Sequence, residues 1–300
     1  MEPQGMTGRV LRNVSMKRYT SMKVGGTVPY LFYPEDEAGL RAAIAWLKDA
    51  GLPFRFLGNG TNVIVADRGF AAGLIRVSRM RHLRFSITET GALVTAGAGL
   101  PLKSVIRSCA AKGLTGLEKL FGIPGTVGGA LKMNAGSFGA AISDCLISLR
   151  YMDERGEVQK RRRDEMGFGY RSSSIADGHC VVEATFELTR AEPSRIQADM
   201  DDVWRERLRK HPMEKPSAGS VFKNGNNGPC WRLVDRAGLR GATVGGACVS
   251  EKHPNFIVNM GGASASDVKR LIETMKKRVA EATGVALEEE VELWGFDDGA

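Results

Sequence analysis

The glycine-rich segment 114–136 is the part of this sequence that most restricts how the chain can fold. Its glycines are Gly116, Gly122, Gly125, Gly128, Gly129 and Gly136. Glycine adopts positive φ angles at little cost and lets backbone N–H groups approach a ligand closely. Successive N–H groups that point in one direction can bind an anion, and Pro124 fixes one φ angle within the turn. The segment therefore predicts either a loop around a phosphorylated cofactor or a set of tight turns between short strands.

A second glycine turn, Gly58-Asn59-Gly60-Thr61-Asn62, lies between two apolar segments that we predict to be strands, 54–57 and 63–65. The side chains of Thr61 and Asn62 can donate hydrogen bonds to phosphate oxygens. The alternative is a β-hairpin closed by an Asn-Gly turn. Because two such turns occur in one chain, we favour a ligand-binding role for both.

The composition favours an anionic partner and gives no sign of a metal. The chain has 300 residues and a formal net charge of +8, which fits either a phosphorylated ligand or a well-solvated basic surface. The basic run 160–163 has no interleaved aromatic residues, so we expect no nucleic-acid binding. The five cysteines are widely spaced and form no C-x-x-C pair, which indicates reduced thiols and no metal site.

The hydrophobic pattern predicts no membrane insertion, and the reduced thiols fit a cytoplasmic location. No run of about 18 apolar residues occurs, and the polar start of the chain has no signal-peptide pattern. We expect a poorly ordered tail over 1–14, a compact polar loop over 217–224 and a final strand over 285–294. The spacing of apolar residues predicts helices over 36–50, 102–112 and 230–237, one from Pro193, and a last one capped by Ser266 and ended by Gly284.

Several short motifs occur in an order that resembles one enzyme family. They are Gly58 to Asn62, Gly122-Ile123-Pro124-Gly125-Thr126-Val127-Gly128-Gly129-Ala130, Asn134-Ala135-Gly136, Tyr170-Arg171, Ala218 to Asn224, and Glu290-Val291. Together they are similar to the UDP-N-acetylenolpyruvoylglucosamine reductases, and the resemblance covers nearly the whole chain. The chain lacks the extra tyrosine-bearing loop of the longer enzymes, so it resembles the shorter class. It departs from the common pattern at Thr61, where serine is usual, and at Gly225, where proline is usual.

The resemblance implies an α+β fold with a two-lobed FAD-binding unit of the vanillyl-alcohol-oxidase (PCMH) type, followed by a smaller α+β substrate domain. We expect the FAD-binding unit over 15–191, with lobes of about 15–75 and 76–191. The substrate domain would cover 192–289, and a C-terminal strand and tail would cover 290–300. FAD, held without a covalent link, would lie between the lobes with its pyrophosphate at the two glycine turns. The implied cofactor-binding residues are Gly58, Asn59, Gly60, Thr61, Asn62, Gly122, Ile123, Pro124, Gly125, Thr126, Gly128, Gly129, Asn134, Ala135 and Gly136.

The implied reaction reduces the enolpyruvyl group of UDP-N-acetylglucosamine enolpyruvate to give UDP-N-acetylmuramate, with NADPH as co-substrate. Negative charge then develops on the carboxylate next to the double bond, so positive charge and a proton donor are needed there. The resemblance assigns these tasks to Arg171, Ser220 and Glu290. It also implies contacts with the nucleotide-sugar from Tyr170, Lys223, Asn224 and His253. No protein partner can be inferred.

Two other interpretations are compatible with the same residues. The first is another FAD-dependent oxidase or dehydrogenase of the same fold, although neither glycine loop contains a histidine or cysteine for a covalent flavin link. The second is a basic nucleotide-binding protein without enzymatic activity, which would be colourless when purified.

Overall fold

The computed structural model describes residues 5–225 and 228–296 and divides into two compact units. Unit 1 comprises Met1–Arg12, Tyr30–Asn59 and Ala72–Glu206, and unit 2 comprises Asn13–Pro29, Gly60–Ala71 and Arg207–Ala300. The predicted boundaries at 191 and 289 stay predictions, and the end of the predicted tail, 297–300, lies outside the described residues.

The first sheet of the chain contains a parallel βαβ arrangement. Its strand order is β1-β2-β5-β3, with β1 (Gly8–Ser15), β2 (Thr27–Pro34), β5 (Gly73–Ile75) and β3 (Phe54–Phe56). Both β2 and β3 pair with β5 in parallel. The helix α1 (Glu37–Asp49) connects β2 to β3 and buries Leu40, Ala43, Ile44 and Leu47, the stripe that the sequence predicts.

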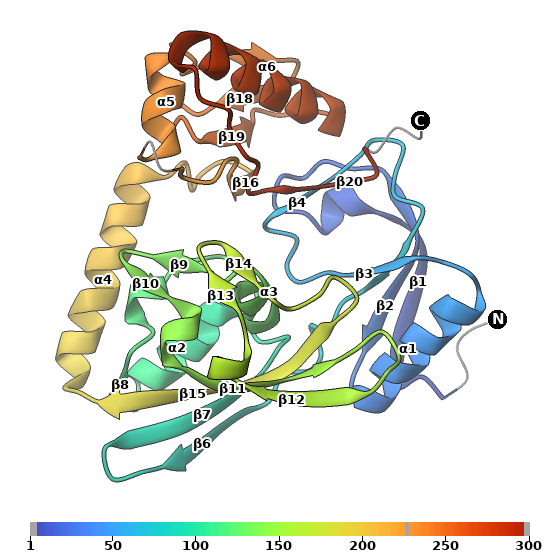
Figure 1. Ribbon diagram of the computed structural model, residues 1–300, viewed down its shortest axis with the longest axis vertical. Coiled ribbons are helices and arrows are strands. Elements are labelled where there is room, and N and C mark those ends of the chain that lie inside the picture. Colours follow the sequence, from blue (N-terminus) through green and yellow to red (C-terminus); the bar gives the residue numbers. More distant parts are fainter. Residues whose placement is uncertain (1–4, 226–227, 297–300) are drawn as a thin grey trace. The chain divides into compact units, whose positions relative to one another are not determined.

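A larger antiparallel sheet forms the centre of unit 1. Its order is β12-β11-β15-β7-β6, with β12 (Val158–Arg162), β11 (Leu146–Met152), β15 (Cys180–Arg190), β7 (Gly91–Gly97) and β6 (Leu83–Ile87), and β8 (Leu114–Thr115) also pairs with β15. The helices α2 (Leu102–Ala110) and α3 (Val127–Lys132) lie over this sheet (Figure 1). Val94 and Phe186 of the sheet pack in one core with Val105 and Leu131 of the helices.

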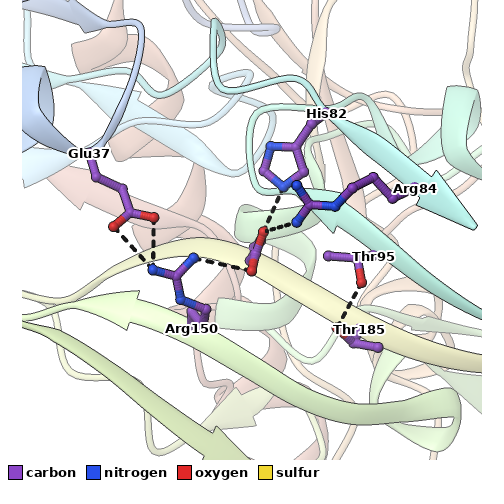
Figure 2. A network of polar contacts seen from close by, with 7 residues as sticks. Glu37, His82, Arg84, Thr95, Arg150 and Thr185 are labelled. Carbon is purple, nitrogen blue, oxygen red and sulfur yellow. Dashed lines mark hydrogen bonds and ion pairs between the residues drawn. The ribbon is translucent and has the colours of Figure 1, made fainter. Parts of the chain in front are cut away.

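A network of charged side chains joins α1 to this sheet (Figure 2). Glu183 accepts hydrogen bonds from His82 Nε2 at 2.7 Å, Arg84 Nη2 at 2.9 Å and Arg150 Nη1 at 3.2 Å, and Arg150 also pairs with Glu37. Burial by itself would raise the pKa of Glu183, but the hydrogen bonds from Arg150 and His82 lower it below the usual value. The carboxylate therefore stays charged and holds three basic side chains in place.

Unit 2 combines an antiparallel sheet with two helices. The sheet order is β16-β19-β18-β17, with β16 (Ser217–Ser220), β19 (Phe256–Asn259), β18 (Ala247–Val249) and β17 (Thr243–Val244). The helices are α5 (Cys230–Arg236) and α6 (Ala265–Thr283), and the apolar stripe of α6 shares a core with Phe222 and Ile257. In the same unit β4 (Val63–Val65) pairs in parallel with β20 (Glu292–Trp294).

The remaining elements are short apart from one long helix. The helix α4 (Pro193–Lys210) begins at the predicted proline. In one short antiparallel ribbon, β9 (Gly136–Ser137) pairs with β10 (Ala140–Ala141). In another, β13 (Phe168–Gly169) pairs with β14 (Ser172–Ser173). Single turns of 3-10 helix cover Met16–Arg18, Glu118–Leu120, Ile142–Cys145 and Arg163–Glu165.

Three local predictions were wrong, and the hairpin alternative for 58–62 is not observed. The expected tail contains β1, which is held by backbone pairing rather than by an apolar face. The segments around 58–62 form no hairpin, because β3 pairs with β5 and β4 pairs with β20. The expected polar loop contains β16, and the expected final strand is reduced to β20. Except for β1, which pairs with the next strand β2, these differences concern strands whose partners are distant in the sequence.

The N-terminus of α6 is capped by Ser264 and not, as predicted, by Ser266. Ser264 Oγ accepts from the N–H of Asp267 at 3.0 Å, and Asp267 accepts in return from the N–H of Ser264 at 3.0 Å. Ser266 bonds instead to Asp67, which accepts from the N–H of Ala265 at 2.9 Å and from the N–H and hydroxyl of Ser266 at 2.8 and 2.7 Å. Asp67 thus fixes the loop after β4 to the start of α6.

We expect Asp67→Ala to destabilise unit 2 by about 1–2 kcal/mol at neutral pH, because it removes three hydrogen bonds and a negative charge at a helix N-terminus. Burial raises the pKa of Asp67, but the bonds from Ser266 and Ala265 lower it below 3.8. The stabilisation is therefore present above pH 3.8 and lost as the pH falls through the lower pKa of the folded state. Urea unfolding of both proteins at several pH values measures the difference.

A matched control for this prediction is Glu281→Ala at the other end of α6, where the carboxylate lies 4.0 Å from Lys277 in an exposed pair. This change should alter the free energy of unfolding by less than about 0.5 kcal/mol. Equal effects of the two substitutions would contradict the role given to Asp67.

Candidate active site

In unit 1 the beginning of the turn at 58–62 lies beside the second glycine loop. A Cβ atom placed on Gly58 would lie 3.0 Å from Thr126 Oγ1. Thr126 is buried at the start of α3, where its hydroxyl accepts from the N–H of Gly129 at 3.3 Å. Gly122 and Gly125 have φ angles of 84° and 141°, so the loop needs glycine at both positions. The two glycine segments singled out from the sequence are therefore neighbours.

The glycines of these loops serve two different purposes. A Cβ on Gly60 would collide with the carbonyl oxygen of Tyr19, and one on Gly128 would lie 3.0 Å from Ala98 Cβ, so these two permit close packing of the chain itself. A Cβ on Gly58 or Gly129 would meet only Thr126 Oγ1 within 4 Å, neighbouring backbone aside, among the described residues. Gly58 and Gly129 therefore leave open backbone surface on which a ligand can lie.

Asn134 provides a buried acceptor in the same unit. Its side chain is 7% exposed, and its Nδ2 donates to the carbonyl oxygen of Gly169 at 2.8 Å. Its Oδ1 is buried and has no hydrogen-bond partner in the part of the chain that the structure describes. A buried carbonyl oxygen without a donor is costly, which favours a ligand donor at this position. The open glycine surface and this oxygen both fit a bound dinucleotide that carries N–H and hydroxyl groups.

Arg171 lies at the tip of the ribbon formed by β13 and β14. Tyr170 and Arg171 are the two turn residues, and Arg171 has a φ angle of 53°, which is unusual for a residue other than glycine. A Cβ on Gly136 would lie 3.2 Å from Arg171 Nη1, so the missing side chain of Gly136 leaves room for the guanidinium. Tyr170 is 54% exposed, and the guanidinium of Arg171 lies 5.3 Å from the centre of its ring.

In unit 2 the backbone of Glu290 lies close to that of Ser220, because Glu290 bonds to Val221, the residue that follows Ser220. Ser220 ends β16 opposite Phe256. The carbonyl oxygen of Val221 accepts from the N–H of Glu290 at 2.7 Å, which places the backbone of Glu290 beside the residue that follows Ser220. The Nδ2 of Asn62 in turn donates to the carbonyl oxygen of Glu290 at 2.9 Å. Three segments that are far apart in the sequence thus meet at one place.

The other glutamates near Glu290 have structural partners. Glu288 pairs with Lys223 at 2.5 Å, Glu289 pairs with Lys276 at 2.8 Å, and Glu292 accepts from Trp294 Nε1 at 2.9 Å.

Burial raises the pKa of the Cys230 thiol to about 12, and the carboxylate of Glu290 contributes to this rise. The thiol of Cys230 is therefore protonated at neutral pH and cannot act as a nucleophile.

Asn255 is a residue that the sequence analysis missed. It is 4% exposed, its Nδ2 donates to the carbonyl oxygen of Phe222 at 2.8 Å, and its Oδ1 accepts from the N–H of Phe222 at 3.0 Å. Its backbone carbonyl oxygen also accepts from the N–H of Val221 at 2.8 Å. Asn255 therefore fixes the two residues that follow Ser220. The only signal in the sequence is an asparagine beside an apolar strand.

The remaining predicted substrate residues all lie in unit 2. Asn224 Oδ1 accepts from the N–H of Cys230 at 2.9 Å, and Lys223 is paired with Glu288. Burial lowers the pKa of His253 to about 4, and burial with nearby positive charge lowers that of His211 to about 4. The two rings are 5.3 Å apart. Both imidazoles are neutral at physiological pH, so His253 can bind a substrate only as an uncharged hydrogen-bonding group.

The predicted site residues are thus distributed over both units. Unit 1 contains Arg171, Tyr170, Gly58, Asn59 and all the predicted cofactor residues between 122 and 136. Unit 2 contains Gly60, Thr61 and Asn62 together with Ser220, Lys223, Asn224, His253 and Glu290. The structure groups Arg171 with Asn134 and Gly136, and it groups Ser220 with Asn62 and Glu290.

Comparison with known proteins decides the family. The UDP-N-acetylenolpyruvoylglucosamine reductase of Geobacter metallireducens is 40% identical over 290 residues, which cover 97% of this chain and 95% of that protein. The chain belongs to the UDP-N-acetylenolpyruvoylglucosamine reductase family. The reductase of Geobacter sulfurreducens is 41% identical over 289 residues, which cover 96% of this chain and 95% of that protein.

Family models and a solved structure agree with this reductase family. The C-terminal domain of UDP-N-acetylenolpyruvoylglucosamine reductase matches residues 211–294, and an FAD binding domain matches residues 28–161. The crystal structure of the Thermus caldophilus reductase (MurB) aligns with a TM-score of 0.81 at 35% identity and covers 96% of this chain and 100% of that one. These matches confirm the predicted family, the fold class and the FAD cofactor, and they decide against the two alternative interpretations.

The described residues contain neither a helix that could span a membrane nor a cluster that could bind a metal. None of their helices combines the length and the apolar character that crossing a membrane requires. No three histidine, cysteine, aspartate or glutamate side chains within the described ranges are grouped so that they could hold a metal ion.

Proposed function

We propose that this protein reduces the enolpyruvyl group of UDP-N-acetylglucosamine enolpyruvate to give UDP-N-acetylmuramate, a precursor of peptidoglycan, with NADPH as the reductant. The observation that carries the proposal is the match to the reductases, which extends over 97% of the chain and includes both of their domains. The motifs that carry Arg171, Ser220 and Glu290 are all present. We also propose a cytoplasmic location and membership of the shorter class, without the extra tyrosine-bearing loop.

The residues that would hold FAD are those with open backbone or an unused acceptor. In unit 1 these are Gly58, Gly129 and the oxygen of Asn134, with Gly122 and Gly125 shaping the loop. When bound, FAD supplies hydride transfer from NADPH to the enolpyruvyl double bond. Backbone N–H groups in such loops can bind the pyrophosphate without a positively charged side chain. The other predicted cofactor residues, including Ile123, Pro124 and Ala135, complete the proposed binding segments.

Arg171 is proposed to stabilise the charge that develops on the substrate carboxylate during reduction. Its guanidinium stays protonated and presents two parallel N–H donors to a carboxylate. Its backbone has a positive φ angle. Such strained conformations persist only where the surrounding structure supports them, and they are common at functional sites. This interaction is stronger in the transition state than in the bound substrate, because the negative charge on the carboxylate increases.

Ser220 and Glu290 are proposed to deliver the proton that completes the reduction. The Ser220 hydroxyl would donate it to the carbon that bears the carboxylate, since a small hydroxyl at the end of β16 can approach a ligand closely. A serine is a weak acid, so its proton must be replaced or relayed, and Glu290 would do this. The backbone contact between Glu290 and Val221 supports this pairing.

Each predicted substrate-binding residue is proposed to make one kind of contact. Because the His253 imidazole is neutral, we propose that it contacts the nucleotide-sugar through N–H donation, and that Lys223 supplies positive charge close to its partner Glu288. Asn224 and Tyr170 would contribute polar and aromatic contacts.

Anaerobic absorbance spectra test the proposed function. The purified protein should be yellow, addition of NADPH should bleach the flavin band, and subsequent addition of the enolpyruvyl UDP-sugar should restore it with formation of UDP-N-acetylmuramate. Restoration by oxygen alone, with no response to the UDP-sugar, would contradict the proposal. Parallel titration with NADH measures the preference for NADPH.

A further inference from the structure

The turn that carries Arg171 is too small to be stable by itself. The strands β13 and β14 have two residues each, and an isolated two-stranded hairpin is at best marginally stable in water. The positive φ angle of Arg171 adds a further cost for an L-residue with a side chain. A precise position of the guanidinium therefore requires support from outside the turn.

The support comes from the last residue of α3 and the segment that follows it, and it acts on both strands. On β13, the carbonyl oxygen of Gly169 accepts from Asn134 Nδ2 at 2.8 Å. On β14, the hydroxyl of Ser173 donates to the carbonyl oxygen of Lys132 at 2.7 Å. Lys132 Nζ also donates to the carbonyl oxygen of Ile175 at 2.5 Å, just beyond β14. The residues 132–134 thus hold the ribbon on each side of its tip.

The same segment also determines the space that Arg171 occupies. Gly136 follows Asn134 by two residues, and a side chain at this position would lie against Arg171 Nη1. The helix α3 begins at Val127, directly after its N-cap Thr126 in the glycine loop, and ends at Lys132. One short helix therefore connects the proposed cofactor loop at its start to the support of Arg171 at its end.

We propose that Ser173 is a positioning residue for Arg171, and that Asn134 shares this task in addition to the ligand contact proposed for its oxygen. The proposal rests on the proposed function of Arg171. Loss of the Ser173 hydroxyl removes the hydrogen bond that holds β14 itself to α3, so the guanidinium spends less time in the position that stabilises the substrate carboxylate. The Ser173 hydroxyl donates to the carbonyl oxygen of Lys132, so its proposed effect on the reaction is indirect and passes through Arg171.

The first test compares Ser173→Ala with Ser172→Ala, a change at the neighbouring exposed serine of the same strand. We expect Ser173→Ala to slow reoxidation of the reduced flavin by the enolpyruvyl substrate about tenfold, the effect of losing one partly buried hydrogen bond. Flavin reduction by NADPH should change less than twofold. Ser172→Ala should leave both steps unchanged, and Ser173→Thr, which keeps a hydroxyl, should restore most of the lost rate.

A binding measurement separates a positioning role from a general loss of structure. UDP-N-acetylmuramate carries the carboxylate, whereas UDP-N-acetylglucosamine does not. Ser173→Ala should weaken binding of the first ligand several-fold and leave binding of the second unchanged. Equal weakening of both ligands would overturn the proposal.

A double-mutant cycle completes the test. In an Arg171→Ala background, Ser173→Ala should cause no further loss of reoxidation rate, because its effect passes through the arginine. Additive losses, or full activity of Ser173→Ala, would overturn the proposal. If Ser173→Ala does not fold, Asn134→Asp removes the donor to Gly169 on the other strand and is tested in the same cycle. An inactive wild-type protein would instead refute the proposed function.

Discussion

Replacing Ser220 with alanine should slow reoxidation of the reduced flavin by the enolpyruvyl UDP-sugar at least about 10²-fold, while flavin reduction by NADPH stays near normal. The expected size is that of losing one well-placed general acid. The two half-reactions differ because the hydroxyl of Ser220 is proposed to act only on the substrate carbon. Anaerobic stopped-flow absorbance at the flavin band measures each step separately.

A control for this prediction lies in the same strand. Ser217 uses its backbone carbonyl oxygen, which accepts from Ser21 Oγ at 2.6 Å, so Ser217→Ala preserves that contact. Both half-reactions of Ser217→Ala should match those of the wild-type protein. If Ser220→Ala slows both half-reactions by the same factor, the assignment of Ser220 as proton donor is wrong.

The second large effect is expected for Asn255→Ala, which should destabilise unit 2 by about 2–4 kcal/mol. The substitution leaves the N–H and the carbonyl oxygen of Phe222 buried without their partners, and each such group costs about 1–3 kcal/mol. Phe222 itself is fully buried in the core of the unit, so water cannot replace the lost bonds easily. Urea unfolding followed by circular dichroism measures the change.

Asn255→Ala should also lower activity at temperatures where the protein stays folded, because Val221 and Phe222 fix the backbone next to Ser220 and Glu290. The matched control is Lys252→Ala on the same loop, whose long ion pair with Glu214 at 4.0 Å contributes little. It should change the free energy of unfolding by less than about 0.5 kcal/mol. A stability loss below about 1 kcal/mol for Asn255→Ala would contradict the role given to its two side-chain bonds.

The helices other than α3 could be predicted from the sequence because their signals are local, whereas the six-residue α3 within the glycine-rich segment was not predicted. The apolar spacing of Leu40, Ile44 and Leu47 corresponds to the buried face of α1. Gly284 ends α6 in the left-handed conformation, with a φ angle of 71°. The error at the start of α6 has a physical reason: several serines there can cap a helix, and the choice of Ser264 depends on Asp67, which is distant in the sequence.

The strands could be predicted less well because their partners are distant. No residue near Val63 indicates that β4 pairs with β20 rather than with β3. The hairpin alternative rested on these neighbouring residues alone. The short strand β16 contains Ser217 and Gly219, which are typical of turns, and pairing with β19 makes it a strand. In each case the backbone hydrogen bonds of the partner outweigh the local preference.

The candidate site could likewise be predicted where its signals are local and not where it depends on distant segments. The two glycine turns could be identified from composition, and the structure places Gly58 beside Thr126. The choice of Glu290 among four glutamates required the family resemblance, since spacing alone did not distinguish them. The left-handed backbone of Arg171 and its support by Ser173 and Asn134 could not be predicted, because both depend on contacts between segments that no motif connects.

The pairing of β4 with β20 has a consequence for synthesis on the ribosome. Residues Val63–Val65 leave the ribosome long before their partners Glu292–Trp294 are translated. At about 5–20 residues per second, the early strand waits roughly 10–45 s for its partner. A message that ends before the codon for Glu292 therefore yields a polypeptide in which this strand has no partner and is exposed to chaperones and proteases.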